Sequence, residues 1–423
     1  MTANGEKILA LAKTLFPICR SITGDGVRQT LKILSQEIPL EIHEVPTGTK
    51  VCDWSIPKEW NIRSAFIANE KGEIIVDFKN HNLHIVSYSI PVDKWLTLSE
   101  LEEHLYSLPE QPNAIPYVTS YYKERWGFCL THEQRSKLQE GNYHVFIDSD
   151  LKEGYLSYGE YFIKGQSDEE VFLSTYICHP SMANNELSGP SVAVFIAKWL
   201  ASAPRKYSYR IVFTPETIGS ITYLSRHLEE LRKNVKLGFN LTCMGDERDY
   251  SYVASPYGAT LADKIINNVL KHNHPDFTQY SFLDRGSDER QYCSPGVDLP
   301  LVTLCRSKFG TYDEYHTSLD NFDLVTAKGL QGSYELLQDC IEVNEANKIY
   351  KLACCGEPQL GKRGLYPNLS TKDMSVETII NLVAYANGSN DLIDISNFIE
   401  VPVKSILPIA KKLFEAGLLE VVD

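Results

Sequence analysis

Two histidines and two glutamates follow segments of the sequence that read as buried strands. His179 ends "STYICH", and Glu186 lies in the loop after it; Glu216 ends "YSYRIVFTPE", and His316 lies in "YDEYHTSLDNFD". Open α/β sheets place their sites at the carboxyl ends of strands, so we expect these side chains to lie close together. Neutral imidazole and carboxylate are the ligands that zinc uses in catalytic sites, with one position open to water. The residue types and their placement therefore indicate a metal site.

The segments around these residues predict an α/β core. From about residue 154 the sequence alternates between apolar runs that read as strands, such as "EVFLSTYICH" and "LPLVTLCRS", and helical patterns, such as "LSGPSVAVFIAKWLASA". This alternation is typical of a mostly parallel sheet with helices on both faces. Residues 5–37 read as two helices around a Gly-Asp-Gly turn. We assign residues 1–41 and 151–350 to this domain.

Two further segments differ from the core. Residues 42–150 contain short alternating apolar segments, such as "SAFIANEKGEIIVDF", and aromatic clusters, as in "PYVTSYYKERWGFCL". We interpret them as an inserted β-rich domain. After a linker around "CCGEPQLGKRGLYPNLS", residues 370–423 show three helical patterns and a closing strand, which is the outline of a winged helix.

The predicted winged helix is acidic. Its candidate recognition helix carries Lys404, Lys411 and Lys412, but residues 376–423 also contain seven acidic side chains. DNA binding needs a basic face. We therefore do not expect nucleic acid as a partner, and we interpret this unit as a packing or assembly module that would suit a homo-oligomer.

Composition excludes several functional classes. The chain has 423 residues and a formal net charge of −14, which argues against a general binder of nucleic acid or anionic membranes. No segment approaches the roughly 18 consecutive apolar residues of a membrane span, and no basic leader precedes an apolar run at the N-terminus. The ten cysteines are scattered without a CxxC pair, which favours reduced thiols. We expect a cytoplasmic protein without a membrane partner.

Several motifs resemble the zinc aminopeptidase superfamily, which includes leucyl aminopeptidases, glutamate carboxypeptidases and glutaminyl cyclases. "CHPSMANNELSG" is similar to its His…Asp-x-x-Ser-Gly segment, "PETIGS" to Glu-Glu-x-Gly, and "YHTSLDNFD" to the last ligand histidine with its trailing acids. "CRSITGDGVR", "WNI" and "SYYKERWGFC" also resemble a branch of aminopeptidase-like proteins from bacterial polysaccharide-biosynthesis loci. The resemblance implies a zinc-peptidase-like (phosphorylase/hydrolase-like) α/β core, an inserted β-rich domain, a C-terminal winged helix and zinc as the cofactor.

Three positions depart from the two-metal pattern of that superfamily. The bridging aspartate falls on Asn185, the second glutamate of Glu-Glu-x-Gly on Thr217, and the aspartate after the next strand near Thr242, with Asp246 the nearest acid. A neutral amide is a poor bridge between two dications, and two Zn²⁺ ions need anionic ligands in order to lie close together. We therefore reject a two-zinc site and predict a single zinc ion.

The remaining side chains can hold one ion. His179, Glu186 and His316 have the His-Glu-His composition of several single-zinc peptidase sites. Glu186 would equally serve as a cap for the helix that follows it. Whether Glu186, Asn185 or Asp246 completes the ligand set stays open at this point.

Two acidic residues have expected roles beside the metal. By the resemblance, Glu216 stands at the general-base position, although a glutamate facing a helix dipole would occupy the same place. We expect Asp320 to orient His316, with capping of the following helix as the alternative.

Four charged residues are candidates for substrate binding. Arginine suits a carboxylate or phosphate through its planar fork, and aspartate suits an amino group. Surface salt bridging explains the same residue types equally well. The candidates are Asp288, Arg290, Arg285 and Arg20.

These observations predict a single-zinc hydrolase of aminopeptidase-like type that cleaves an amide or peptide bond in a small-molecule substrate. One alternative is a catalytically inactive pseudo-peptidase that binds a ligand or serves in assembly. Another is non-hydrolytic chemistry on the same scaffold, such as cyclisation of a glutamyl N-terminus. The sequence does not specify the substrate.

Overall fold

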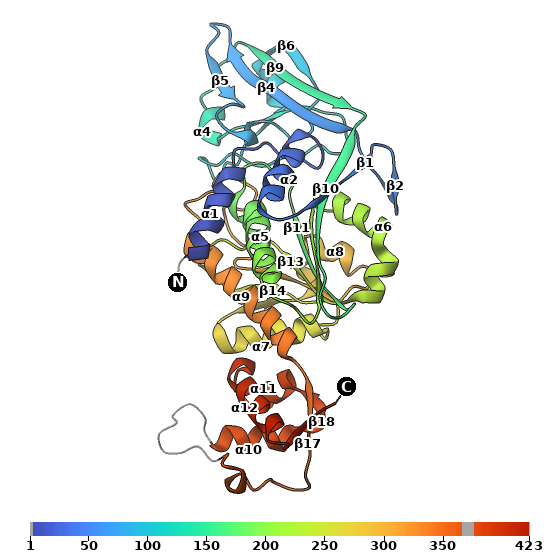
Figure 1. Ribbon diagram of the computed structural model, residues 1–423. Coiled ribbons are helices and arrows are strands. Elements are labelled where there is room, and N and C mark those ends of the chain that lie inside the picture. The colour runs from blue at the N-terminus through green and yellow to red at the C-terminus, as the bar shows by residue number, and fades with distance from the viewer. Residues whose placement is uncertain (1–2, 366–375, 423) are drawn as a thin grey trace. The chain divides into compact units, whose positions relative to one another are not determined.

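Eight strands form the large sheet of this protein (Figure 1). The computed structural model describes residues 3–365 and 376–422. In sheet order the strands are β1 (Glu41–Pro46), β10 (Tyr155–Ile163), β12 (Ser208–Thr214), β11 (Glu170–Tyr176), β13 (Val235–Leu241), β16 (Leu301–Cys305), β14 (Ser251–Val253) and β15 (Thr278–Tyr280). The central strands β12, β11, β13 and β16 run parallel. Every residue of β11 and β12 is buried, as continuous apolar runs covered on both faces predict.

Helices connect the parallel strands on both faces of the sheet. Helix α5 (Ser188–Ala201) leads from β11 to β12, and α6 (Ile218–Asn234) leads back across β11 to β13. Parallel crossovers are right-handed, so two connections that move in opposite directions place their helices on opposite faces. The same core includes α1 (Ala3–Leu15), α2 (Asp25–Glu37), the π-helical turn η2 (Ala183–Leu187), η3 (Phe282–Asp284) and α8 (Glu289–Tyr292). The predicted mixed α/β class with a mostly parallel sheet is confirmed.

A second sheet lies between β1 and β10 in the sequence. Its strands, in the order β5-β4-β9-β6, are β5 (Ile74–Asp77), β4 (Glu59–Asn69), β9 (Asn142–Lys152) and β6 (Val92–Thr97). Shorter elements accompany it: β2 (Lys50–Val51), β3 (Trp54–Ser55), η1 (Asn82–His84), α3 (Leu98–Glu102), β7 (Leu105–Tyr106), β8 (Phe128–Cys129) and α4 (His132–Arg135). The predicted start of the insertion at residue 42 is wrong, because β1 pairs with β10 in the large sheet.

The Gly-Asp-Gly turn attaches this inserted region to the core. Gly24 has a φ of 99°, and a Cβ atom there would lie 2.2 Å from the carbonyl oxygen of Trp60 in β4. Beside it, the backbone N–H of Asp25 donates to Asn61 Oδ1 over 2.7 Å, and Arg28 forms an ion pair with Glu59. The motifs "CRSITGDGVR" and "WNI" therefore meet at one contact.

We expect Gly24→Ala to lower the free energy of unfolding by about 3 kcal/mol. The unfavourable backbone conformation costs about 1–3 kcal/mol, and the clash with Trp60 adds an overpacking cost of about 1–3 kcal/mol. Gly72→Ala is the matched control, because Gly72 has a φ of 78° with nothing within 4 Å of its added Cβ, and it should cost about 1 kcal/mol. Equal urea midpoints for the two variants would show that the Gly24 contact does not stabilise the fold.

The chain divides into two compact units. The first comprises residues 1–258 and 278–334, and the second comprises residues 259–277 and 335–423. The second unit contains α7 (Leu261–Asn273), most of α9 (Ala327–Ala346), β17 (Ile349–Leu352), η4 (Gly361–Arg363), α10 (Val376–Tyr385), β18 (Asn387–Asp391), α11 (Leu392–Ile399), α12 (Val403–Glu415) and β19 (Leu419–Val422). The three helices and the closing strand of the predicted winged helix are confirmed. The boundary at residue 350 is wrong, because β17 pairs with both β18 and β19. Residues 370–375 of the predicted domain lie outside the described residues.

The recognition-helix candidate α12 has part of its charge neutralised within its own unit. Lys404 forms ion pairs with Asp339 and Glu342, so this lysine is not free to meet phosphate. That the unit does not bind nucleic acid stays a prediction. In the part of the chain that the structure describes, no helix is long and apolar enough to cross a membrane. All ten cysteines are free thiols.

Candidate functional site

Three of the predicted site residues follow parallel strands at the centre of the large sheet. His179 follows β11, Glu216 follows β12, and His316 lies in the long loop after β16. All three line one cavity of about 290 Å³. The strand ends therefore bring these side chains together as the sequence predicts. The remaining lining residues are Ile22, Trp54, Tyr117, Thr119, Tyr121, Tyr122, Cys178, Thr217, Ile218 and Arg290.

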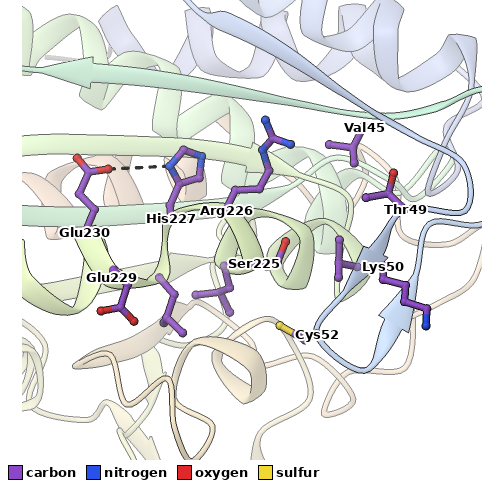
Figure 2. Close-up of a pocket in the computed structure, with 12 residues that line it drawn as sticks. Val45, Thr49, Lys50, Cys52, Ser225, Arg226, His227, Glu229 and Glu230 are labelled. Carbon is purple, nitrogen blue, oxygen red and sulfur yellow. Dashed lines mark ion pairs between the residues drawn. The ribbon is translucent and has the colours of Figure 1, made fainter.

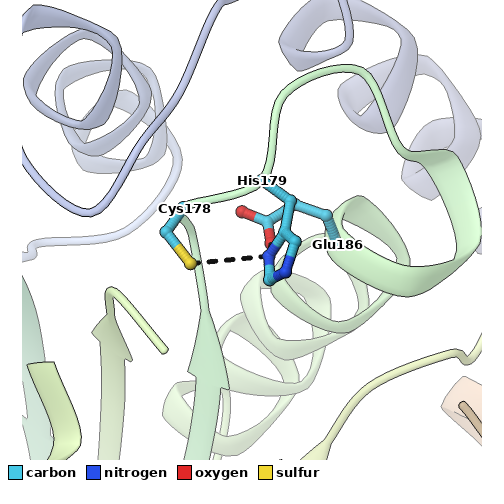
Figure 3. Close-up of side chains that lie close together, drawn as sticks. All are labelled: Cys178, His179 and Glu186. Atoms are coloured by element: carbon cyan, nitrogen blue, oxygen red, sulfur yellow. Dashed lines mark hydrogen bonds and ion pairs between the residues drawn. The ribbon is translucent and has the colours of Figure 1, made fainter. Parts of the chain in front are cut away.

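The two ring nitrogens of His179 face different surroundings. Its Nδ1 shares a hydrogen bond of 2.8 Å with Glu186 Oε2 and lies 3.4 Å from Cys178 Sγ, as Figure 3 shows. Its Nε2 lies 3.7 Å from Glu216 Oε2, beyond hydrogen-bond distance. The carboxyl group of Glu186 thus holds the ring from behind and leaves Nε2 toward the cavity, the arrangement in which a carboxylate orients a metal-binding histidine.

Glu186 does not line the cavity with His179 and His316, so its membership of the predicted ligand set of His179, Glu186 and His316 stays a prediction. Glu186 is buried and lies on the Nδ1 side of His179, whereas His316 lines the cavity on the other side. Among the described residues, the group of three metal-ligating side chains whose donor atoms all lie within 4.8 Å of one another is Cys178, His179 and Glu186. A separation of 2.8 Å between His179 Nδ1 and Glu186 Oε2 is that of a hydrogen bond, so we interpret this group as support for the ring.

His316 is held in a backbone conformation that non-glycine residues rarely adopt. Its φ is 56°, its ring stacks on Tyr315 with centroids 3.9 Å apart, and its carbonyl accepts a hydrogen bond of 2.8 Å from the N–H of Tyr117. Its Nε2 is buried without a hydrogen-bond partner. The ring centroids of His316 and His179 lie 5.4 Å apart. Strain of this kind marks functional sites, and here it occurs at a residue that lines the cavity and carries a buried, unpaired imidazole nitrogen.

Both histidines are neutral near pH 7. Burial, reinforced by the charge of Arg20, lowers the pKa of His179 to about 3. Burial, reinforced by His179, lowers the pKa of His316 to about 3. Neutral imidazole is the form that binds a metal ion, so the two rings are already in the required protonation state.

Glu216 is a half-buried carboxyl group with a strongly perturbed affinity for protons. Burial, and then the nearby carboxyl group of Asp288, raise the pKa of Glu216 well above its ordinary value, while Arg290 opposes them. Asp288 Oδ1 accepts hydrogen bonds from the N–H of Thr217 and the hydroxyl of Ser220, and burial raises its pKa to about 6. Asp288 therefore caps α6 and does not line the cavity, contrary to its predicted contact with substrate.

The three positions where the resemblance expects anionic ligands carry neutral side chains with other partners. Asn185 Nδ2 donates to the Tyr176 hydroxyl over 2.7 Å, Thr242 Oγ1 donates to the Asn185 carbonyl over 3.0 Å, and Thr217 Oγ1 accepts from Arg290 Nη2 over 2.6 Å. The amide oxygen of Asn185 is buried and has no hydrogen-bond partner. These contacts leave no carboxylate to bridge two cations.

Asp246 and Asp320 accept hydrogen bonds from backbone N–H groups of the loops around the site. Asp246 accepts hydrogen bonds from the backbone N–H and the hydroxyl of Ser307 and from Asn184 Nδ2, so we exclude it as a ligand. Asp320 accepts from the backbone N–H groups of Asn184 and Asn185. The prediction that Asp320 orients His316 is wrong: its carboxyl group caps the turn η2, which carries Glu186.

The predicted substrate-binding arginines separate into three environments. Arg20 is fully buried, donates to the carbonyls of His179 and Leu15, and lies 3.6 Å from Glu186, so it supports the site from behind. Arg285 is exposed, donates to the carbonyl of Phe282 and does not line the cavity. Only Arg290 lines the cavity. The predicted substrate contacts of Arg20 and Arg285 are therefore wrong.

The aromatic wall of the cavity was missed in the sequence. Tyr117, Tyr121, Tyr122 and Trp54 come from the inserted region and line the cavity. The segment before them docks on the loop of His316, where Pro116 forms a β-bridge with Thr317. The many aromatic residues in "PYVTSYYKERWGFC" could have indicated an aromatic binding site. The sequence does not indicate, however, which of the rings face a cavity.

A larger cavity of about 740 Å³ lies between α6 and the hairpin β2–β3 (Figure 2). Its charged side chains have mixed signs, and Glu230 is held by Arg210 and lies 4.0 Å from His227. None of the predicted catalytic or metal-binding residues lines it. We therefore assign the candidate active site to the cavity of about 290 Å³, although it is the smaller of the two.

The unpaired atoms around the smaller cavity are consistent with a bound cation. Native interiors leave few buried polar atoms without partners. Two buried polar atoms without a hydrogen-bond partner here are of types that bind metals, His316 Nε2 and Asn185 Oδ1. The others nearby are Glu186 Oε1, Asp288 Oδ2 and Arg20 Nη2. The residues present therefore fit one zinc ion on the cavity side of His179, and they do not fit two.

Comparison with known proteins places this architecture in a family. The DUF4910 domain of unknown function matches residues 9–347. The chain belongs to the DUF4910 family. A winged helix-turn-helix matches residues 348–421, in agreement with the position of β17. A Clostridium acetobutylicum protein, named for polysaccharide biosynthesis and an aminopeptidase-like domain, is 46% identical over 99% of this DUF4910 chain and 97% of its own length. The resemblance to that branch is confirmed.

Solved structures extend the comparison to the fold. A crystal structure from Clostridium acetobutylicum, whose name proposes a peptidase, matches with a TM-score of 0.94 at 45% identity over 100% of this chain and 97% of that one. A zinc aminopeptidase from Bacillus subtilis matches with a TM-score of 0.58 at 12% identity, over 81% of this chain and 95% of that one. This DUF4910 protein therefore has an aminopeptidase-like fold.

Proposed function

We propose that this protein is a single-zinc hydrolase that cleaves an amide or peptide bond in a small substrate. The observation that carries the proposal is the convergence of two neutral histidines and the carboxyl group of Glu216 on one cavity. The name of the Clostridium acetobutylicum relative supports a substrate that contains a sugar. The ten free cysteines support a location in the cytoplasm, and the acidic winged helix supports a role in assembly.

Two neutral donors from the cavity lining would hold the zinc ion, Nε2 of His179 and Nε2 of His316. The amide oxygen of Asn185 is buried, unpaired and outside the lining, and it would be the third donor. Tyr176 connects Asn185 with His179, because its hydroxyl accepts from Asn185 Nδ2 and its ring centroid lies 5.3 Å from that of His179. Neutral donors compensate less of the charge of the ion than carboxylates do, so we expect weaker zinc binding than in sites with a bridging aspartate.

The protein side chains supply the proton transfer and the orientation of the substrate. A zinc ion bound there would polarise the carbonyl group of the substrate and lower the pKa of water. Glu216 can accept a proton from the attacking water and return it to the leaving amine. Its burial and its neighbour Asp288 raise its affinity for that proton. The aromatic walls exclude bulk water from the group being cleaved.

We expect the purified full-length protein to bind about one zinc ion per chain. His316→Ala should weaken binding by at least about 10–100-fold, the loss that follows even from removing a partner behind a ligand. Asn185→Asp should tighten binding, because it adds a negative charge beside the ion. Zinc is measured by mass spectrometry after dialysis against buffered free zinc.

His132→Ala serves as the control, since His132 does not line the cavity and its loss should leave zinc binding unchanged. Wild-type affinity in His316→Ala, or an Asn185→Asp variant that binds more weakly, would contradict the proposed ligand set.

The second candidate function is that of an inactive pseudo-peptidase. It is favoured by the neutral residues Asn185, Thr217 and Thr242 at the expected ligand positions. A protein without zinc at micromolar free zinc and without amide hydrolysis would support this candidate over the enzyme.

A further inference from the structure

We propose that the cavity binds a small saccharide amide that carries an acidic group. This inference rests on the proposed function, because it names the class of substrate for the same site. Two features of the lining carry it: a cation without an ion-pair partner and a rim of aromatic rings and hydroxyl groups. Each feature comes from a different part of the chain.

Arg290 is the cation. Its side chain is exposed, and Nη2 donates to Thr217 Oγ1 over 2.6 Å. Among the described residues no carboxylate lies within 4.0 Å of its guanidinium group, and its charge acts from farther away on the carboxyl groups of Glu216 and Asp288. The other N–H groups therefore remain available. A planar guanidinium fork suits a carboxylate or a phosphate, and hydrogen bonds to such groups are the strong ones.

The position of Arg290 is fixed by its neighbours. Thr217, which accepts from it, has a φ of 64°, and Asp288, two residues before it, is buried as the cap of α6. In the two-metal pattern the position of Thr217 carries a glutamate. Here a neutral threonine stands at that position and Arg290 donates to it, so the cavity has a cation available for an anion brought by the substrate.

Trp54 and Tyr122 form the aromatic rim. They expose 37% and 59% of their surface, respectively, and their rings meet edge to face with centroids 5.7 Å apart. Inside the rim, the hydroxyl groups of Tyr117 and Tyr121 lie 2.5 Å apart. Flat apolar faces suit the C–H faces of a saccharide ring, and hydroxyl groups suit its edge. An apolar amino-acid side chain would instead favour walls of aliphatic residues, of which the cavity has only Ile22 and Ile218.

The size of the cavity limits the ligand. Its volume of about 290 Å³ lies at the lower end of the range for small-molecule sites, about 300–1,000 Å³. One sugar ring with a short acyl group fits this space, whereas an extended polymer segment does not.

Calorimetry on the full-length protein tests this inference with three probes. N-acetylmuramic acid carries a carboxylate, N-acetylglucosamine 6-phosphate carries a phosphate, and N-acetylglucosamine carries neither. We expect at least one acidic probe to bind about tenfold more tightly than the neutral probe, the gain from one charged hydrogen-bonding group. The comparison of the two acidic probes identifies the preferred anion.

Matched variants test which residues cause the preference for acidic probes. Arg290→Gln should remove the difference between acidic and neutral probes, whereas Arg285→Gln, an exposed arginine outside the cavity, should retain it. Trp54→Ala should weaken all three probes by a similar factor, whereas Trp95→Ala, at an exposed tryptophan of β6, should weaken none.

Equal binding of the three probes, an equal effect of Arg290→Gln and Arg285→Gln, or no binding at about 10 mM would overturn the inference. Because binding requires no turnover, the proposed function fails separately. A preference for acidic probes in a protein without zinc or hydrolysis would leave the ligand class standing. Hydrolysis of neutral amides without any such preference would remove the ligand class alone.

Discussion

Replacing Glu216 with glutamine is expected to lower kcat/KM for amide hydrolysis by about 10²–10⁴-fold, the contribution of a positioned acid-base group. Glutamine keeps the shape of the side chain but can neither accept the proton of the attacking water nor return it to the leaving amine. Glu216 is the half-buried carboxyl group among the residues that line the cavity. The loss should therefore appear in kcat, with little change in KM.

The same variant should retain its zinc and its stability. Glu216 lies 3.7 Å from His179 Nε2 and makes no hydrogen bond to it, and the removal of this acid does not unpair another charge. Glu229→Gln is the matched control, because Glu229 is exposed on α6 outside this cavity. Activity is measured on a panel of N-acyl amino sugars and aminoacyl amides. Turnover within about threefold of the wild type would exclude Glu216 from the mechanism.

Replacing Arg20 with methionine is expected to lower the free energy of unfolding by about 3–5 kcal/mol, the cost of removing one partner of a buried ion pair. Arg20 is fully buried and lies 3.6 Å from Glu186. Its Nε donates to the His179 carbonyl over 3.0 Å and its Nη1 to the Leu15 carbonyl over 2.7 Å. The variant removes a donor from each of these two carbonyls, of which that of Leu15 keeps a hydrogen bond from the N–H of Ile18. It also removes the charge that opposes the rise in the pKa of Glu186.

Urea unfolding of the full chain measures this effect. Arg63→Met is the control: Arg63 pairs with Asp148 and Asp150, but half of its side chain is exposed, so its loss should cost at most about 1 kcal/mol. Arg20→Lys keeps the charge but loses part of the donor geometry and should fall between the two. Equal losses for Arg20→Met and Arg63→Met would show that the buried pair does not hold the site in place.

The predicted placement of His179, Glu216 and His316 was correct for a local reason. The strands before them are continuous apolar runs, and parallel strands end at a common edge. The absence of a carboxylate at two expected ligand positions was also visible in single letters, because Asn185 and Thr217 carry no charge whatever their conformation. Properties of this kind depend on residue type and on neighbours in the sequence.

The differences from the predictions concern the direction in which side chains point. Glu186 had the right type and spacing for a ligand, but it reaches the Nδ1 side of His179. Asp320 was expected beside His316, but its carboxyl group meets the N–H groups of η2, about 135 residues earlier in the chain. Arg20 had the chemistry for substrate but lies behind the site. In each case a contact between distant segments decides the role, and spacing along the chain does not encode it.

The sequence by itself determined the α/β class, the winged helix, the strand ends at which the site forms and the absence of anionic bridging ligands. The tertiary structure decided which nitrogen of His179 faces the cavity, which arginine reaches it and which aromatic rings of the insertion line it. The physical reason is that apolar periodicity and charge are local properties of the chain. The direction of a side chain depends instead on loop backbones such as that of His316, with its φ of 56°, and on the segment around Tyr117 that holds this loop from about 200 residues away.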